Sequence, residues 1–64
     1  MTSTEAHACA KERSRSGSEQ AVIKALPGEL RGPYYAEVFT TAIPSTQIVS
    51  LYTDGALIET AYNA

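Results

Sequence analysis

The fold class of this 64-residue chain is decided by the stretch Gln47-Ile48-Val49-Ser50-Leu51-Tyr52-Thr53-Asp54-Gly55-Ala56-Leu57-Ile58-Glu59-Thr60-Ala61-Tyr62. Two runs rich in β-branched and aromatic residues flank its centre, Asp54-Gly55. An Asp-Gly pair between such runs indicates a tight β-hairpin, because both central residues of a type I′ turn need a positive φ. We therefore expect an antiparallel hairpin over residues 47–62.

The two-residue turn also predicts which side chains of the hairpin face one another. The pairs that we expect to form the core are Leu51 with Ile58, Val49 with Thr60, and Gln47 with Tyr62. The opposite face holds Ile48 with Ala61, Ser50 with Glu59, and Tyr52 with Leu57. Because this second face mixes apolar and charged side chains, we interpret it as a contact surface.

A further strand is predicted upstream of the hairpin. Residues 34–42 are rich in aromatic and β-branched side chains, which favour a strand. Pro44 lies in the connection that follows, and it suits a turn because its nitrogen cannot donate a ladder hydrogen bond. We expect a three-stranded antiparallel meander, in which the register of residues 34–42 stays open.

Two helices are predicted before the strands. Residues 4–13 favour a helix, and Thr2 and Glu5 have the spacing of a capping box. The apolar residues of this segment are mostly alanine, so we expect a frayed helix or a disordered arm with little to bury. Residues 18–26 are predicted to form a second helix, which Pro27-Gly28 would end.

The predicted fold class is therefore α+β, with one or more N-terminal helices packed on a three-stranded antiparallel β-meander. We expect residues 1–17 to be an N-terminal arm, helical or mobile, and residues 18–64 to be a small α+β domain. Such a short chain buries only about 60% of the surface that it exposes when unfolded, and its stability is marginal.

The charge distribution favours a basic partner. Residues 18–64 contain five acidic side chains and two basic ones, which argues against direct binding to nucleic-acid phosphates and favours a basic protein surface. No segment has the pattern of a signal peptide or a membrane span, and the single cysteine suits a reducing compartment. We expect a cytoplasmic protein that does not bind membranes.

The sequence contains no recognisable catalytic or cofactor motif. His7 and Cys9 are the only histidine and the only cysteine, and no zinc-ligand pattern surrounds them. Cys9 also lacks the separate base and orienting residue that a nucleophilic cysteine uses. We expect no enzymatic activity, no metal and no cofactor, and we interpret both residues as structural or incidental.

The candidate partner-binding residues are the acidic side chains of the folded part and two of its tyrosines. Scattered carboxylates usually only solvate a surface, but they also pair with lysine or arginine on a partner. Tyrosine is enriched at interfaces because a large apolar ring carries a polar tip. The residues are Glu29, Glu37, Asp54, Glu59, Tyr35 and Tyr52.

In its small size, its acidic folded part and these residues, the chain resembles the small anti-CRISPR proteins encoded by phages and mobile elements. The resemblance implies a non-enzymatic inhibitor that covers a basic nucleic-acid-binding surface of a CRISPR effector, for instance a type I surveillance complex, in the cytoplasm of a host bacterium. Two alternatives stay open. One is a structural subunit or assembly factor, with a homodimer as one form. The other is a nucleic-acid-binding protein that uses the basic N-terminal arm and stacked tyrosines.

Overall fold

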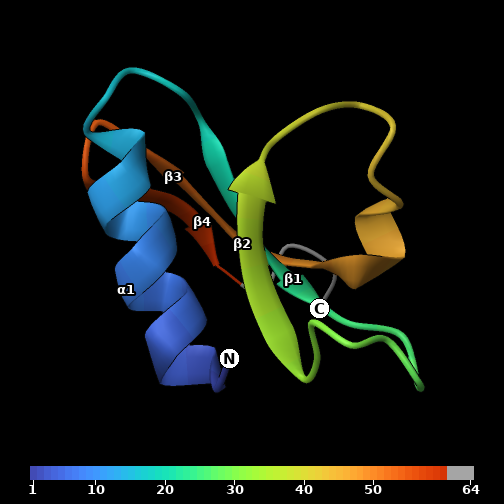
Figure 1. Cartoon of the computed structure of the whole chain (residues 1–64). Helices are drawn as coiled ribbons and strands as arrows, with labels where there is room; N and C mark the ends of the chain where they lie inside the picture. Colours follow the sequence, from blue (N-terminus) through green and yellow to red (C-terminus); the bar gives the residue numbers. More distant parts are fainter. Residues whose placement is uncertain (61–64) are drawn as a thin grey trace.

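The structure is a computed structural model that describes the backbone of residues 1–60 and the side chains of residues 1–58 (Figure 1). Its elements are α1 (Ser3–Ser14), β1 (Gln20–Lys24), β2 (Tyr34–Val38), the 3₁₀ helix η1 (Ser45–Gln47), β3 (Ile48–Thr53) and β4 (Ala56–Thr60). The strands form one antiparallel sheet in the order β2-β1-β3-β4. The α+β class is confirmed, but the three-stranded meander is wrong because a fourth strand, β1, lies between β2 and β3.

Helix α1 begins at the predicted capping box. The Thr2 side chain accepts a hydrogen bond from the backbone N–H of Glu5 at 3.1 Å, and the Glu5 carboxylate accepts one from the N–H of Thr2 at 2.9 Å. Ala6 and Ala10 are fully buried against the sheet. The expectation that the alanines have little to bury is wrong, because small side chains let the helix backbone approach the sheet closely.

Strand β1 replaces the helix predicted over residues 18–26. Val22 points to the face covered by α1, whereas Ile23 points to the opposite face, and both are fully buried. A strand that is buried on both faces is a continuous apolar run without alternation, so its pattern resembles that of a short buried helix. Leu26, which the predicted helix included, is 57% exposed in the following loop.

Both faces of the sheet are covered by other parts of the chain. Helix α1 lies along one face, where it packs on Val22 and Tyr52 (Figure 1). On the opposite face, Phe39 and Ile43 of the β2–η1 connection pack against a buried cluster. The members of this cluster are Ala21, Ile23, Tyr35, Ile48 and Leu51. Among the described residues, no helix has the length and hydropathy to cross a membrane.

The predicted hairpin turn is confirmed, since Asp54 and Gly55 have φ values of 51° and 79°. The pairing of Tyr52 with Leu57 is also confirmed. A bulge between Leu51 and Tyr52 then shifts the register, so that Leu51 faces Glu59 and Ser50 faces Thr60.

This bulge makes three of the predicted hairpin pairs wrong. They are Leu51 with Ile58, Val49 with Thr60, and Ser50 with Glu59. Ile58 is 55% exposed instead of belonging to the core. The predicted pairs of Gln47 with Tyr62 and of Ile48 with Ala61 lie outside the described residues.

Strand β2 is shorter than the predicted strand over residues 34–42, because the chain turns after Val38 towards η1. Its outer edge is partly closed by the N-terminal segment. The N–H of Tyr34 donates to the carbonyl of Met1 at 3.0 Å, and the Arg13 guanidinium donates to the carbonyl of Ala36 at 3.3 Å. These bonds occupy groups that an edge strand otherwise offers to another chain.

Candidate functional site

The candidate site is built on the loop 25–33, which connects β1 to β2. The loop is closed at its base by a hydrogen bond of 2.9 Å from the N–H of Ala25 to the carbonyl of Pro33. Within it, the N–H of Glu29 donates to the carbonyl of Leu26 at 3.1 Å, and the Glu29 carboxylate accepts a bond of 2.8 Å from the N–H of Leu26. These reciprocal bonds fix the position of the Glu29 side chain.

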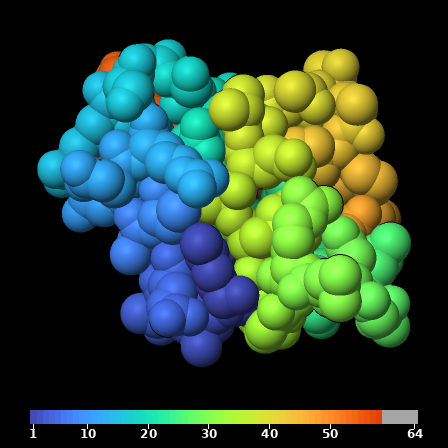
Figure 2. All heavy atoms as spheres, in the orientation of Figure 1, coloured from blue at the N-terminus to red at the C-terminus, as the bar shows by residue number. Residues whose placement is uncertain are grey.

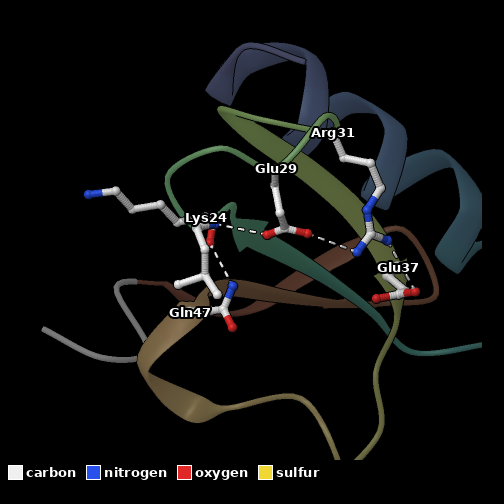
Figure 3. Close-up of polar contacts among 6 residues, drawn as sticks. Lys24, Glu29, Arg31, Glu37 and Gln47 are labelled. Carbon is white, nitrogen blue, oxygen red and sulfur yellow. Dashed lines mark hydrogen bonds and ion pairs between the residues drawn. The ribbon is translucent and has the colours of Figure 1, made fainter.

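Arg31 joins this loop to β2 (Figure 3). One of its guanidinium nitrogens, Nη2, lies 3.1 Å from Glu29 Oε1, and the other, Nη1, lies 3.6 Å from Glu37 Oε1. The central guanidinium carbon lies 3.9 Å from the centroid of the Tyr35 ring, a cation–π distance. We refer to Glu29, Arg31, Tyr35 and Glu37 as the Arg31 cluster.

The surroundings of the cluster alter the proton affinities of its members. The pKa of Glu29 is lowered, first by the hydrogen bond from the Leu26 N–H and then by the bond from Arg31. The pKa of Arg31 is raised, chiefly by its hydrogen bond to Glu29. Burial raises the pKa of the Tyr35 hydroxyl. The cluster contains two acidic side chains and one basic one, which leaves an excess of negative charge.

Two shallow hollows flank the cluster. The first hollow, about 610 Å³ in volume, lies between the loop 25–33 and η1, and is lined by Lys24, Ala25, Leu26, Pro27, Gly28, Glu29, Gly32, Pro33, Tyr34, Thr46 and Gln47. The second hollow, about 520 Å³, lies between β2 and the segment that follows it, and is lined by Tyr35, Glu37, Val38, Thr40, Ala42, Ile43, Pro44 and Gln47. In Figure 2 the loop 25–33, in green, projects at the edge of the molecule.

The structure brings together three of the predicted partner-binding residues, Glu29, Glu37 and Tyr35, around Arg31. Asp54 lies in the β3–β4 turn, beyond the Gln20 end of β1, whereas the loop 25–33 leaves β1 at its other end. The side chain of Glu59 lies outside the described side chains. The predicted set is therefore divided between two ends of the sheet.

Tyr52, the remaining predicted partner-binding residue, is 8% exposed and lies beneath α1. Its ring meets the ring of His7 edge-to-face, with 5.9 Å between the centroids. The expectation that Tyr52 and Ser50 belong to an exposed contact face is wrong, because α1 covers this face of β3 and Ser50 is fully buried.

His7 connects the helix to the sheet. Its Nδ1 lies 2.8 Å from the carbonyl of Ser3 and its Nε2 lies 3.1 Å from the Ser50 hydroxyl. Because a carbonyl can only accept, we assign the proton of the neutral ring to Nδ1, so that Nε2 accepts from Ser50. A serine hydroxyl that contacts a histidine is also the arrangement of an activated nucleophile. Because Ser50 is completely buried, however, a substrate could not reach its hydroxyl.

Cys9 is a partly buried, unpaired thiol on α1. Within residues 1–58, no three side chains of the metal-binding types gather closely enough to hold an ion. Both ring nitrogens of His7 have partners inside the fold.

Sequence reasoning missed Arg31 as the centre of the site. Its contact with Glu29 could have been predicted from the sequence, because the two residues are two positions apart in a short loop rich in proline and glycine. In such a loop, side chains at this spacing can lie close together. The contact with Glu37 was not accessible in this way, because it depends on the pairing of β2 with β1.

Comparison of the chain with protein-family models, curated proteins and solved structures gave no match.

Proposed function

We propose that this protein is a non-enzymatic binding protein that contacts a basic surface of a protein partner through the Arg31 cluster and the second hollow. One observation carries the proposal. The half-exposed carboxylate of Glu37 stands at the rim of a hollow whose apolar walls include Val38, Ile43 and Pro44.

This arrangement suits a lysine or arginine side chain. Such a side chain packs its methylene stem on apolar surface while its charged end stays at the polar rim. Arg31 contacts Glu37 at the long distance of 3.6 Å and is itself shared with Glu29. The Glu37 carboxylate therefore keeps the capacity to accept a further charge-assisted hydrogen bond.

The site is also largely ordered before binding. Arg31 is held between two carboxylates over the Tyr35 ring, and Tyr35 itself is 9% exposed and belongs to the core. A preorganised surface loses less side-chain entropy when a partner binds. A single charged contact therefore contributes more to the affinity here than it would on a mobile surface.

The partner that the resemblance to anti-CRISPR proteins implies is a basic nucleic-acid-binding surface of a CRISPR effector. What supports this narrower proposal is the size of the chain and the acidic excess of residues 18–64. The mechanism is electrostatic and steric competition, in which carboxylates occupy the positions of phosphates opposite lysine and arginine.

The proposal is tested by a matched pair of charge reversals, Glu37→Lys and Glu12→Lys. Glu12 is an exposed residue of α1 whose carboxylate pairs only with Arg15 among the described side chains. Immobilised wild-type and variant proteins are used to capture partners from the source cell, and the captured proteins are compared by mass spectrometry. We expect Glu37→Lys to lose a protein that wild type and Glu12→Lys both retain, because the new lysine repels the basic surface of the partner.

Equal capture by all three proteins would contradict a role of the Arg31 cluster. The narrower proposal has a separate test, in which a purified type I surveillance complex is mixed with target DNA. We expect wild-type protein to reduce DNA binding in a mobility-shift assay and Glu37→Lys to reduce it much less. No inhibition by wild type would exclude this partner class and leave the general binding function standing.

A further inference from the structure

We infer that the chain associates with a second copy of itself across a two-fold axis, with Leu30 of each copy inserted into the first hollow of the other. The inference rests on the shape and charge of the loop 25–33. It does not rest on the proposed function: both use the Arg31 cluster, but the proposed function combines it with the second hollow and the contact between copies combines it with the first hollow.

The loop presents leucine side chains to solvent. Leu30 is fully exposed, at 103% of its reference area, and Leu26 is 57% exposed. The bonds between Glu29 and Leu26, the bond from the N–H of Gly32 to the carbonyl of Glu29, and the closure at Ala25 hold the loop in shape. Leu30 therefore contributes nothing to the core and stays available for an external contact on a loop held by backbone hydrogen bonds.

A recess lies beside this projection. The first hollow is lined mainly by apolar groups of the same loop and its neighbours, and Leu30 is not among its lining residues. A two-fold interface uses the same patch of surface on both copies, so the patch must contain both a projection and the recess that receives it. The loop 25–33 with the first hollow meets this condition.

The patch has opposite charges on its two sides, so that it is complementary to a second copy of itself. Lys24 lies at one side of the first hollow, with its ammonium group directed away from Glu29 (Figure 3). Among the described side chains it forms no ion pair. The Arg31 cluster, with its excess of negative charge, lies at the other side. A two-fold rotation about the centre of the patch places each Lys24 against the acidic side of the other copy, which fixes the orientation of the two copies.

The experiment measures the dimer dissociation constant of the full chain by sedimentation equilibrium over a wide range of protein concentrations. The variants are Leu30→Asp, Leu30→Met, Leu57→Asp and Lys24→Glu. Leu57 is a half-exposed leucine of β4, which makes it the matched control for an aspartate introduced on the surface. Circular dichroism melting checks that each variant is folded.

We expect wild type, Leu30→Met and Leu57→Asp to dimerise alike. Burying a leucine side chain corresponds to a factor of roughly ten to a hundred in an equilibrium constant. Because a two-fold dimer contains this contact twice, Leu30→Asp should weaken association by about the square of that factor. Lys24→Glu should weaken association as well, and the weakening should diminish at high salt.

Three results would overturn the inference. Wild-type protein could stay monomeric at every concentration, or Leu30→Asp could dimerise as wild type does. Alternatively, Leu57→Asp could abolish a dimer that Leu30→Asp leaves intact, in which case the interface would lie at β4. Partner capture by a monomeric Leu30→Asp protein would show that the proposed function stands separately.

Discussion

At the scale of single residues, a few buried polar groups hold the helix against the sheet. Ser14 is the clearest case: its fully buried hydroxyl donates to the carbonyl of Lys11 and accepts from the N–H of Gly55, both at 2.8 Å. The end of α1 is thereby joined to the hairpin turn. The sequence predicts this turn from Asp54-Gly55, but nothing in the sequence assigns Ser14 as its partner.

We predict that Ser14→Ala destabilises the protein by about 1–3 kcal/mol, because it leaves the Gly55 N–H without its hydrogen-bond acceptor. In a domain of this size, each kcal/mol corresponds to roughly 4–8 °C in melting temperature. Thermal unfolding followed by circular dichroism gives the measurement. Ser16→Ala, at an exposed position just beyond the helix, is the control and should melt as wild type does; an unchanged melting temperature for Ser14→Ala would refute the role of this bond.

At the scale of elements, α1 depends on small side chains at the positions that face the sheet. Ala6 and Ala10 are fully buried, while Ala8, between them in the sequence, is exposed. Residues spaced by four lie on one face of a helix, so the alanines define the face that meets Val22 and Tyr52. Alanine is an excellent helix former, and its presence therefore does not by itself distinguish a packed helix from a solvated one.

We predict that Ala10→Leu destabilises the fold by about 1–3 kcal/mol, because a larger side chain overpacks the close contact between helix and sheet. Ala8→Leu adds the same side chain to the exposed face and should have little effect. Chemical denaturation of both variants measures the difference. If Ala10→Leu were as stable as Ala8→Leu, the close packing of α1 on the sheet would be wrong.

Strand β1 is the element that local reasoning assigned incorrectly. Residues 18–26 contain helix-capping residues and a compact apolar run, and both signals fit a short helix. The strand forms instead because β2 and β3 provide hydrogen-bonding partners on its two sides. Val22 and Ile23 then bury their branched side chains on opposite faces. Tertiary pairing of this kind overrides local propensity.

At the scale of the whole molecule, carboxylates that accept backbone hydrogen bonds connect stability to pH. The pKa of Glu5 is lowered mainly by the backbone bond from Thr2, and that of Glu29 mainly by the bond from Leu26. A carboxyl with a lowered folded-state pKa contributes stability above its unfolded pKa and loses it as the pH falls through the folded pKa. Acid should therefore weaken both the helix cap and the loop 25–33.

We predict that wild-type protein loses stability between neutral pH and about pH 3, below the ordinary pKa of glutamate near 4.3. Glu29→Gln should be less stable than wild type at neutral pH, and this difference should shrink as the pH falls and the wild-type carboxyl takes up its proton. Denaturant midpoints at the two pH values give the comparison. Glu12→Gln, which removes only an exposed ion pair among the described contacts, is the control and should be as stable as wild type at both pH values. If the stability difference between Glu29→Gln and wild type were the same at both pH values, the link between the Glu29 carboxylate and acid stability would be wrong.

The sequence by itself determined the features that depend on neighbouring residues. The capping box of Thr2 and Glu5 and the turn at Asp54-Gly55 arise from backbone geometry over a few residues, and both are present. Only the tertiary structure decided that β1 is a central strand, that a bulge shifts the hairpin register, and that Arg31 gathers Glu29 and Glu37. These features depend on contacts between segments that lie far apart in the chain. Which segments pair is decided by how well both faces of the sheet are buried together, and no local sequence pattern encodes this.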